Sequence, residues 1–262
     1  MALRGVLHQE AAGDRFAVRR LPPAPELAPF VDYHWVVRWD LRGRPPYRQP
    51  VLAHPHVHLV YEAGGPRVYG IDRGLFTRLL AGRGRVHGIR FTPGGFRAYS
   101  GGRPVGALAD LRLPAEEFFG PSIAALNPLV LRSPEETGPA AAPLLPAPAA
   151  DPQAAFAGEL VAAVGADRGL LRVGQLAALA GLSVRSLQRL FHEYVGAGPK
   201  WVIRRARLHE LTDRAAGAAV RDAPVDWSAL AADLGYADQA HLTRDFTAAT
   251  GLSPTAYAAA GR

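Results

Sequence analysis

The sequence contains no cysteine, and this absence excludes several kinds of chemistry at once. A chain without thiols has no disulfide framework, no thiol nucleophile and no zinc site with cysteine ligands. Long apolar runs are also missing. No stretch approaches the roughly 20 residues that cross a bilayer, and residues 1–10 lack the apolar run of a secretion signal. We therefore expect a cytoplasmic protein with no membrane partner.

Length and charge set the next limits. The 262 residues are enough for two ordinary domains, each with a core of its own. The 30 Lys and Arg residues outnumber the 23 Asp and Glu residues, which gives a formal net charge of +7. Such an excess fits a nucleic acid, but it would fit an anionic membrane surface as well. Charge alone therefore does not identify the partner.

One short pattern occurs twice in the last two-fifths of the chain. Each copy has an apolar segment, a glycine, a polar residue and a second segment with apolar residues at i, i+3 and i+4. The glycines are Gly181 and Gly235, and the polar residues are Ser183 and Asp238. Glycine adopts the left-handed conformation that ends a helix, and Ser or Asp accepts hydrogen bonds from the first amides of the next. The pattern predicts two helix-turn-helix units within residues 171–257.

A basic segment, residues 199–211, separates the two copies and is predicted to be a linker helix. Residues 168–214 contain nine basic and three acidic residues, a net charge of +6. Residues 215–262 contain three basic and five acidic residues, a net charge of −2. Attraction to phosphates should therefore be concentrated in the first unit and the linker helix.

Residues 151–257 resemble the DNA-binding domain of the arabinose-operon regulator (AraC/XylS) family of bacterial transcription factors. The resemblance is carried by Gly181-Leu182-Ser183 with Leu187-Gln188-Arg189-Leu190-Phe191, by the linker at 199–208, and by residues 235–246 and 251–257. It implies two helix-turn-helix units on a shared helix, which enter major-groove segments about 34 Å apart on one face of a duplex. It also implies RNA polymerase as a protein partner. Because the chain lacks cysteine, it is unlike the related alkylation-damage sensors, which accept an alkyl group on that residue.

The DNA contacts are assigned by exposed position and by match to the family's motif. Arg and Gln on an exposed helix make paired hydrogen bonds to guanine and adenine edges. The predicted base contacts are Arg185, Gln188, Arg189, Gln239, Thr243 and Arg244. The predicted phosphate contacts are Ser186, His192, Lys200, Arg204 and His241, of which His241 has a base contact as its alternative.

Residues 15–113 have the pattern of strands. Apolar and polar residues alternate along residues 31–39, which predicts a strand with one apolar face. Further strands are predicted at residues 57–62, 67–71, 75–80 and 85–91. Several short strands at close spacing favour a β-barrel or a sandwich. A helical turn is predicted at residues 115–119, and Asp151 followed by Pro152 predicts the start of a helix.

Three residues of this part resemble the first metal motif of cupin barrels, namely His56, His58 and Glu62. The resemblance is incomplete, because Ala98 occupies the position of the fourth ligand of a cupin enzyme. Three ligands can still hold a metal with an open position, so one alternative is a metal-dependent cupin enzyme fused to a DNA-binding domain. The incomplete motif favours the other interpretation, a sensor barrel without a cofactor.

A ligand pocket is the second candidate site of the N-terminal part. Its predicted lining residues are Trp35, His56, His58, Tyr69 and Phe91. Apolar and aromatic walls with a few polar groups are typical of small-molecule sites, although any one of these aromatics could instead fill the core. The family resemblance implies that a cupin-like N-terminal domain holds the effector site, the dimer contact or both.

The sequence therefore predicts an α+β protein in three parts. Residues 1–132 are expected to form a cupin-like, β-rich sensor and dimerisation domain, residues 133–150 a linker rich in Pro and Ala, and residues 151–262 a double helix-turn-helix domain. The expected function is non-enzymatic: a regulator of transcription that binds a double-stranded operator, with a small-molecule effector and a homodimeric state as further expectations. The effector, the operator and the choice between activation and repression stay open.

Overall fold

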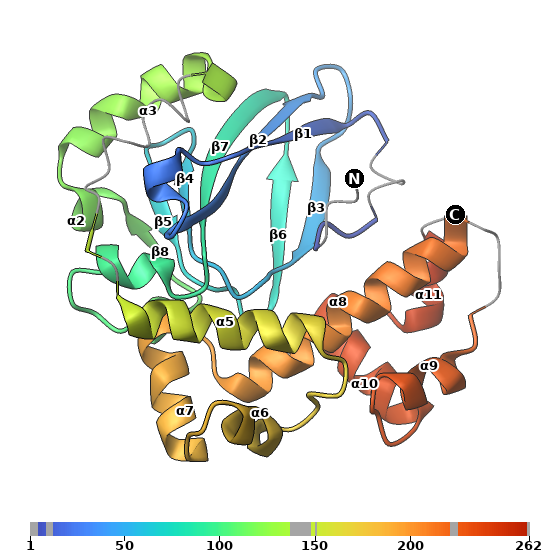
Figure 1. The fold of residues 1–262 in the computed structure, drawn as a ribbon. Coiled ribbons are helices and arrows are strands. Elements are labelled where there is room, and N and C mark those ends of the chain that lie inside the picture. Colours follow the sequence, from blue (N-terminus) through green and yellow to red (C-terminus); the bar gives the residue numbers. More distant parts are fainter. Residues whose placement is uncertain (1–4, 9–12, 137–147, 150, 221–224, 261–262) are drawn as a thin grey trace.

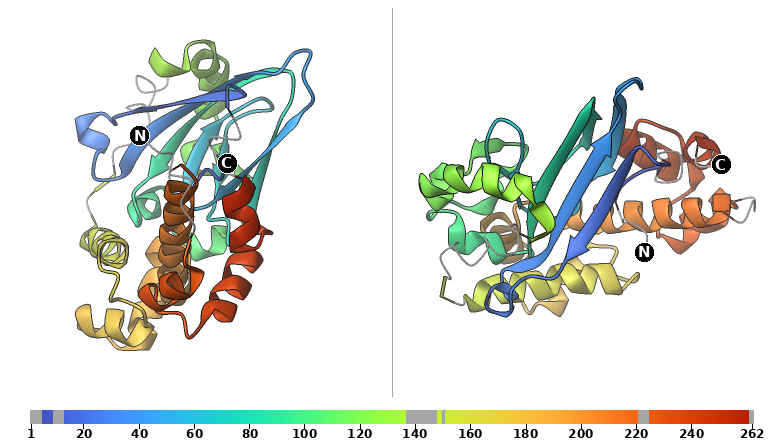
Figure 2. Two further views of the ribbon diagram at one scale, coloured as in Figure 1. Left: turned by 90° about the vertical axis from the view of Figure 1, so that its right-hand side faces the viewer. Right: turned by 90° about the horizontal axis from the view of Figure 1, so that it is seen from above.

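The computed structural model describes residues 5–8, 13–136, 148–149, 151–220 and 225–260. Figure 1 shows a β-rich N-terminal half above a helical C-terminal half, with α5 (Pro152–Ala166) and α8 (Pro199–Val220) along the junction. The side view in Figure 2 also places the helical half below the sheets. The predicted α+β organisation is confirmed.

Two antiparallel sheets make up the β-rich half. The larger sheet has six strands in the spatial order β1 (Phe16–Leu21), β2 (Val31–Asp40), β7 (Arg83–Phe91), β4 (His58–Tyr61), β5 (Arg67–Tyr69) and β8 (Arg112–Pro114). The smaller sheet pairs β3 (Tyr47–Leu52) with β6 (Leu75–Leu80). The predicted strands are confirmed, whereas β1, β3 and β8 were not predicted.

In the described part of the chain, the two sheets do not close into a hydrogen-bonded barrel. Among the described residues, no ladder of hydrogen bonds joins the larger sheet to the smaller one. The reason lies in β5, which pairs with β4 on one edge and with β8 on the other, so it has no free edge for β6. Side chains from both sheets, such as Trp35 of β2 and Phe76 of β6, line the space between them.

Strand β2 is covered on both faces, because each of its faces meets a different layer; the face toward the smaller sheet is half-buried. Trp35 and Trp39 point toward the smaller sheet, and their indoles lie over Gly88 and Gly84 of β7. A Cβ at Gly88 would come within 2.0 Å of the Trp35 ring, so only glycine leaves room for it. On the opposite face, Val36 is buried under the helices that cover the sheet.

That covering layer consists of short helices, and it encloses the main core of the β-rich half. Its members are η2 (Gly95–Tyr99), η3 (Val105–Leu108), α2 (Glu116–Phe119) and α3 (Ser122–Arg132). Phe91 of the sheet meets Phe96 and Tyr99 at ring distances of 5.0 and 5.4 Å. Helix α3 was not predicted, because Pro128 lies inside it and proline usually interrupts a helix.

The two predicted helix-turn-helix units are confirmed. The first contains α6 (Val173–Leu179) and α7 (Val184–Leu190), which continues into a π-helical turn, η5 (Phe191–Val195). The second contains α9 (Trp227–Asp233) and α10 (Gln239–Thr250) and is followed by α11 (Pro254–Ala260). Gly181 and Gly235 have φ of +63° and +70°, the left-handed conformation that the turns require.

The two halves share their cores. The core of the first unit includes Ile71 of the β-rich half, and the core of the second includes Leu7 and Leu52. Gly196, which ends η5, lies so close to Val105 that an added Cβ would be 2.8 Å from its side chain. Of the predicted linker, residues 137–147 and 150 lie outside the described residues, and α5 begins at residue 152.

Candidate DNA-binding surface and enclosed cavity

The first recognition helix, α7, presents a polar face to solvent. Its N-cap Ser183 accepts a hydrogen bond from the backbone N–H of Ser186 at 3.1 Å. Leu187 and Leu190 are buried and fix the rotation of the helix. On the opposite face the exposed side chains are Arg185, Gln188 and Arg189. Within the described part of the chain, none of these three has an ion pair or a side-chain hydrogen bond, so each is available to a partner.

The predicted phosphate contacts of the first unit differ in their surroundings. Lys200 is exposed at the start of α8. His192 is exposed on η5 and lies close to Gly106, where an added Cβ would be 2.2 Å from its Nδ1. The hydroxyl of Ser186 is half-buried and accepts a hydrogen bond from Ser183 at 3.0 Å.

The second recognition helix, α10, repeats this arrangement. Asp238 caps it by accepting a hydrogen bond from the N–H of His241 at 2.6 Å. Leu242 and Phe246 are fully buried, as their counterparts in α7 are. The exposed residues include Gln239, His241 and Arg244, whereas Thr243 is half-buried. In Figure 1 the first unit lies below α5 and α8, on the side away from the sheets, and α10 of the second unit also contacts β3.

Arg204, a predicted phosphate contact, is paired with a carboxylate in the structure. Its Nε forms an ion pair with Asp245 of α10. The hydroxyl of Tyr236 donates to the same carboxylate at 2.9 Å, and the guanidinium of Arg207 lies 4.7 Å from the Tyr236 ring centre. This network ties α10 to α8. Sequence spacing gives no signal for it, because the contact joins residues from different helices.

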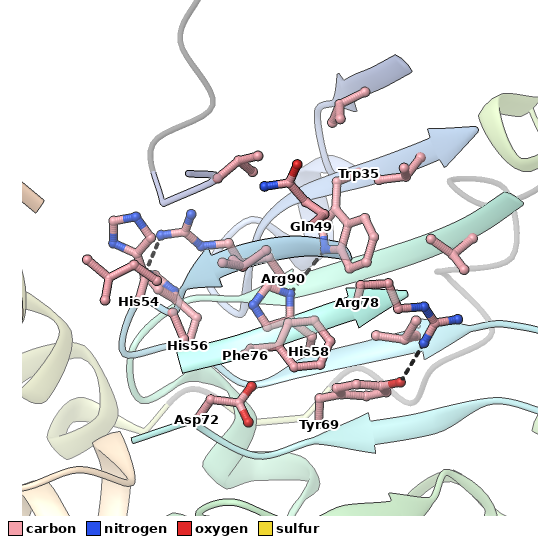
Figure 3. A pocket seen from close by; sticks show the side chains of 18 of the residues that line it. Trp35, Gln49, His54, His56, His58, Tyr69, Asp72, Phe76, Arg78 and Arg90 are labelled. Atoms are coloured by element: carbon pink, nitrogen blue, oxygen red, sulfur yellow. Dashed lines mark hydrogen bonds between the residues drawn. The ribbon is translucent and has the colours of Figure 1, made fainter. Parts of the chain in front are cut away.

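A cavity of about 230 Å³ lies between the two sheets. Figure 3 shows its lining, with Trp35 and Phe76 in its wall, His54 and His56 at one end and His58 near the middle, beside Trp35. Four of the five predicted pocket residues line it: Trp35, His56, His58 and Tyr69.

Phe91, the fifth predicted pocket residue, does not line the cavity. It follows Arg90, which does, and alternation along β7 turns the Phe91 side chain to the opposite face. There it is fully buried against Phe96 and Tyr99. It belongs to the core under η2.

A hydrogen bond from Trp35 fixes which nitrogen of His58 carries the proton. The indole Nε1 of Trp35 donates to Nδ1 of His58 at 3.1 Å (Figure 3). Burial, reinforced by Arg90, lowers the pKa of His58 to about 3. The ring is therefore neutral at physiological pH with its proton on Nε2, so it can donate a hydrogen bond to a ligand.

The three candidate metal ligands have other partners. His56 Nδ1 donates to the carbonyl of Phe91 at 2.8 Å, and its Nε2 faces the guanidinium of Arg90. Glu62 accepts from Tyr69 at 2.5 Å and pairs with Arg78 at 2.7 Å. Among the residues that the structure describes, no three His, Asp or Glu side chains are grouped to hold a metal ion.

The charges in the cavity wall are mostly paired. Arg90 pairs with Asp32 at 3.2 Å, and Asp72 pairs with Arg112 at 2.5 Å. Arg20 differs, because its guanidinium lies over a tyrosine ring at 4.7 Å and has no ion pair within the described residues. The cavity is thus apolar over most of its wall, with one uncompensated cation at its side.

A row of buried polar rings crosses the other face of the larger sheet. His34 and His87 stack with ring centres 5.2 Å apart, and a hydrogen bond of 3.1 Å joins Nδ1 of His34 to Nε2 of His87. Tyr61 stacks on His87 at 5.8 Å. Burial lowers the pKa of His34 to about 4 and that of His87 to about 3. Local sequence patterns do not predict this row, because its members lie on three separate strands.

Comparison with known proteins matches the two halves to two families. Residues 19–114 match a domain family of unknown function (DUF6597), and residues 176–260 match the family "Helix-turn-helix domain". Comparison with curated proteins finds no match. Among the residues described, no helix has the length and apolarity needed to span a membrane.

Several solved structures are similar to the chain. ToxT from Vibrio cholerae has a TM-score of 0.41 at 10% identity, covering 94% of this chain and 97% of its own. An AraC-type transcriptional regulator from Chromobacterium violaceum has a TM-score of 0.33 at 22% identity, covering 39% and 88%. The C-terminal domain of AraT, a response regulator from Geobacillus stearothermophilus, has a TM-score of 0.33 at 18% identity, covering 38% and 81%.

Proposed function

We propose that this chain, a DNA-binding transcription regulator of the AraC/XylS type, reads its operator with the exposed faces of α7 and α10. One observation supports this most directly: Arg185, Arg189 and Arg244 are exposed and have no ion pair within the described residues, on helices whose opposite faces are buried. An arginine held in this way can make bidentate contacts to a guanine edge in the major groove.

Each residue of the two faces has a role in this proposal. The base contacts are Arg185, Gln188 and Arg189 in the first unit and Gln239, Thr243 and Arg244 in the second. The phosphate contacts are Ser186, His192, Lys200 and His241. Phosphate contacts set the position of the protein on the duplex, and base contacts give specificity.

The same proposal extends to the whole chain. Residues 1–132 form a sensor and dimerisation domain, residues 133–150 a linker, and residues 151–262 the DNA-binding domain. The protein acts in the cytoplasm as a homodimer, contacts RNA polymerase and catalyses no reaction. Its operator is asymmetric, because the two units differ in sequence and are therefore expected to read different bases in groove segments about 34 Å apart.

Selection from a random duplex library tests the DNA-binding proposal. The full chain should enrich one asymmetric sequence with two conserved segments about one helical turn apart. Arg189→Ala should abolish the preference in the first segment only, and Arg244→Ala in the second only. Recovery of no consensus by the wild type, or loss of both segments in either variant, would contradict the assignment.

The cavity between the sheets is the site that we propose for the effector. Its wall is mainly apolar, and the Nε2–H of His58 offers one oriented donor. Such a site suits a small, largely apolar molecule with one hydrogen-bond acceptor. A screen by thermal shift tests this, because a ligand that binds only the folded state raises the melting temperature. Val37→Phe, which fills the cavity, should remove the shift, and a shift that survives this change would place the ligand elsewhere.

A further inference from the structure

A second cavity, of about 250 Å³, lies where the β-rich half meets the helices. It opens between α5, α8 and the segment that joins β3 to β4. Its apolar wall contains Val161, Val164, Val202 and Ala206. Its polar lining consists of His54, His56, Arg205 and His209, and no acidic residue takes part. The lining is therefore apolar on one side and polar on the other, where Arg205 carries a positive charge.

Arg205 is the unusual member of this lining. Arg205 is only 3% exposed to solvent. One terminal nitrogen, Nη2, donates to the carbonyl of Arg73 at 2.8 Å, and the guanidinium lies 4.5 Å from the ring centre of Trp201. The other, Nη1, is buried without a hydrogen-bond partner, and no carboxylate among the described residues forms an ion pair with Arg205.

The charge on this side chain persists at neutral pH. Burial, with Arg204 nearby, lowers the pKa of Arg205 to about 10, which still leaves it protonated. The charges of Asp72 and Asp245 favour the protonated form, but neither carboxylate forms an ion pair with Arg205. A buried charged donor without a direct partner on Nη1 is costly, and an anion in the adjacent cavity would supply that partner.

We propose that this cavity binds a small organic acid whose carboxylate pairs with Nη1 of Arg205 and whose short apolar body packs among the valines of α5 and α8. The guanidinium of Arg205 favours an anion, and the apolar wall favours a carbon chain over a bare inorganic ion. The rings of His54 and His209, stacked 3.7 Å apart with 4° between their planes, form part of the same wall.

The position of the site gives it a consequence for regulation. His54 and His56 belong to the β-rich half, whereas Arg205 and His209 belong to α8, which joins the two helix-turn-helix units. A bound acid would therefore contact both halves and stabilise their present arrangement. This site shares His54 and His56 with the proposed effector cavity between the sheets, but its Arg205 and its apolar wall from α5 and α8 belong to this site alone.

Isothermal titration of the full chain with acetate, butyrate, hexanoate and inorganic phosphate tests the proposal. Each added methylene that is buried should tighten binding about fourfold, so hexanoate should bind more than tenfold tighter than butyrate. Phosphate should bind more weakly than hexanoate. Absence of hexanoate binding, or phosphate binding that equals or exceeds it, would overturn the proposal.

Two variants test whether the acid binds in this cavity. Arg205→Met keeps an unbranched apolar stem and removes the charge, and it should weaken hexanoate binding at least tenfold. Ala162→Trp, at an exposed position on the rim, leaves Arg205 in place and should block the cavity to a similar degree. Arg48→Met, which removes an exposed arginine of β3 outside both cavities, should bind hexanoate as the wild type does.

The melting temperature of each variant without ligand shows whether it is folded. If Arg205→Met does not fold, Ala162→Trp decides the result. Hexanoate binding of unchanged affinity in the folded variants would assign the acid to another place, including the cavity between the sheets, and would refute this site. Neither outcome bears on whether the recognition helices bind DNA.

Discussion

The two halves of the molecule hold their polar side chains in opposite ways. On the recognition helices, Arg185 and Arg189 are exposed and unpaired within the described residues. In the β-rich half, His34 and His87 are fully buried and bonded to each other. The first arrangement leaves functional groups free for an external partner, and the second makes them part of the folded core.

This difference has an energetic consequence. Substituting an exposed, unpaired side chain usually changes stability by less than about 0.5 kcal/mol, so its role appears in binding and not in folding. A buried ionisable group behaves in the reverse way, because its pKa differs between the folded and unfolded states and couples stability to pH. The helical half should thus respond to DNA and salt, and the β-rich half to pH.

The largest expected effect is acid destabilisation of the β-rich half. Folding lowers the pKa of His34 to about 4 and of His87 to about 3, from 6.5. The unfolded chain therefore binds protons that the folded chain does not bind, so the free energy of unfolding falls as the pH drops below 6.5. By pH 4 each histidine should cost about 3 kcal/mol of unfolding free energy. Urea denaturation at pH 7.5, 6, 5 and 4 measures this loss.

Substitutions of histidine in each half sharpen that comparison. Replacing the buried pair, in the double variant His34→Leu/His87→Leu, should remove several kcal/mol of the acid-dependent loss. His192→Asn and His241→Asn change exposed residues of the helical half and should leave the profile unaltered. An equal change from both pairs of substitutions would mean that acid sensitivity does not reside in the buried row.

The next effect concerns DNA affinity and compares the two helix-turn-helix units. Arg189→Ala should weaken specific binding by about 1–3 kcal/mol, the usual value of one bidentate contact to guanine. Arg244→Ala should cost less, because its unit lies in the part of the chain with a net charge of −2, against +6 for the first. Fluorescence anisotropy on the selected operator and on unrelated DNA measures both variants.

Two results would alter this picture. Equal losses from Arg189→Ala and Arg244→Ala would contradict the expected dominance of the first unit. An equal loss on operator and unrelated DNA would turn Arg189 into a phosphate contact. Neither variant should change the midpoint of urea denaturation, because both side chains are exposed and unpaired in the described structure.

A smaller effect is expected at the network that orients α10. Asp245→Asn keeps the shape of the side chain and removes the charge that pairs with Arg204. The loss of stability should be about 1 kcal/mol, because the Arg204 side chain is 40% exposed and solvent screens the pair. Specificity in the second operator segment should relax as α10 loses part of its support. Urea denaturation, and anisotropy with substitutions in that segment, measure the two effects.

Phe76→Leu changes a residue of the β-rich half and is the control for a loss of stability that does not involve α10. It should leave the preference for the second segment unchanged, whatever it does to the unfolding free energy. If Asp245→Asn alters stability alone, the carboxylate supports the fold and does not position α10 for reading.

Local patterns predicted the helical half almost completely. Its signals are short-range: a glycine at a turn, an N-cap such as Ser183 or Asp238, and apolar spacing along each helix all act within a few residues. What they did not predict is the ion pair of Arg204 with Asp245, because a contact across 41 positions leaves no local signal.

The β-rich half was predicted less well for the same reason. Alternation along β2 gave its inward aromatic face, but it did not show that His34 on the other face is buried too. Closure of the barrel depends on which edge of β5 is free, and β8 occupies that edge from more than 40 residues away. Pairing between distant strands is a tertiary property that short windows do not contain.

The smallest expected effect separates Lys200 from Arg204, two cations four residues apart on α8. Lys200 is exposed, whereas Arg204 is held by Asp245. If Lys200 contacts one phosphate, Lys200→Ala should lower the slope of log K against log salt by about 0.9, with little effect on sequence preference. Arg204→Ala should leave that slope unchanged and relax specificity in the second segment, as Asp245→Asn does. Measured slopes that fall equally in both variants would show that the ion pair opens on DNA and that Arg204 contacts phosphate after all.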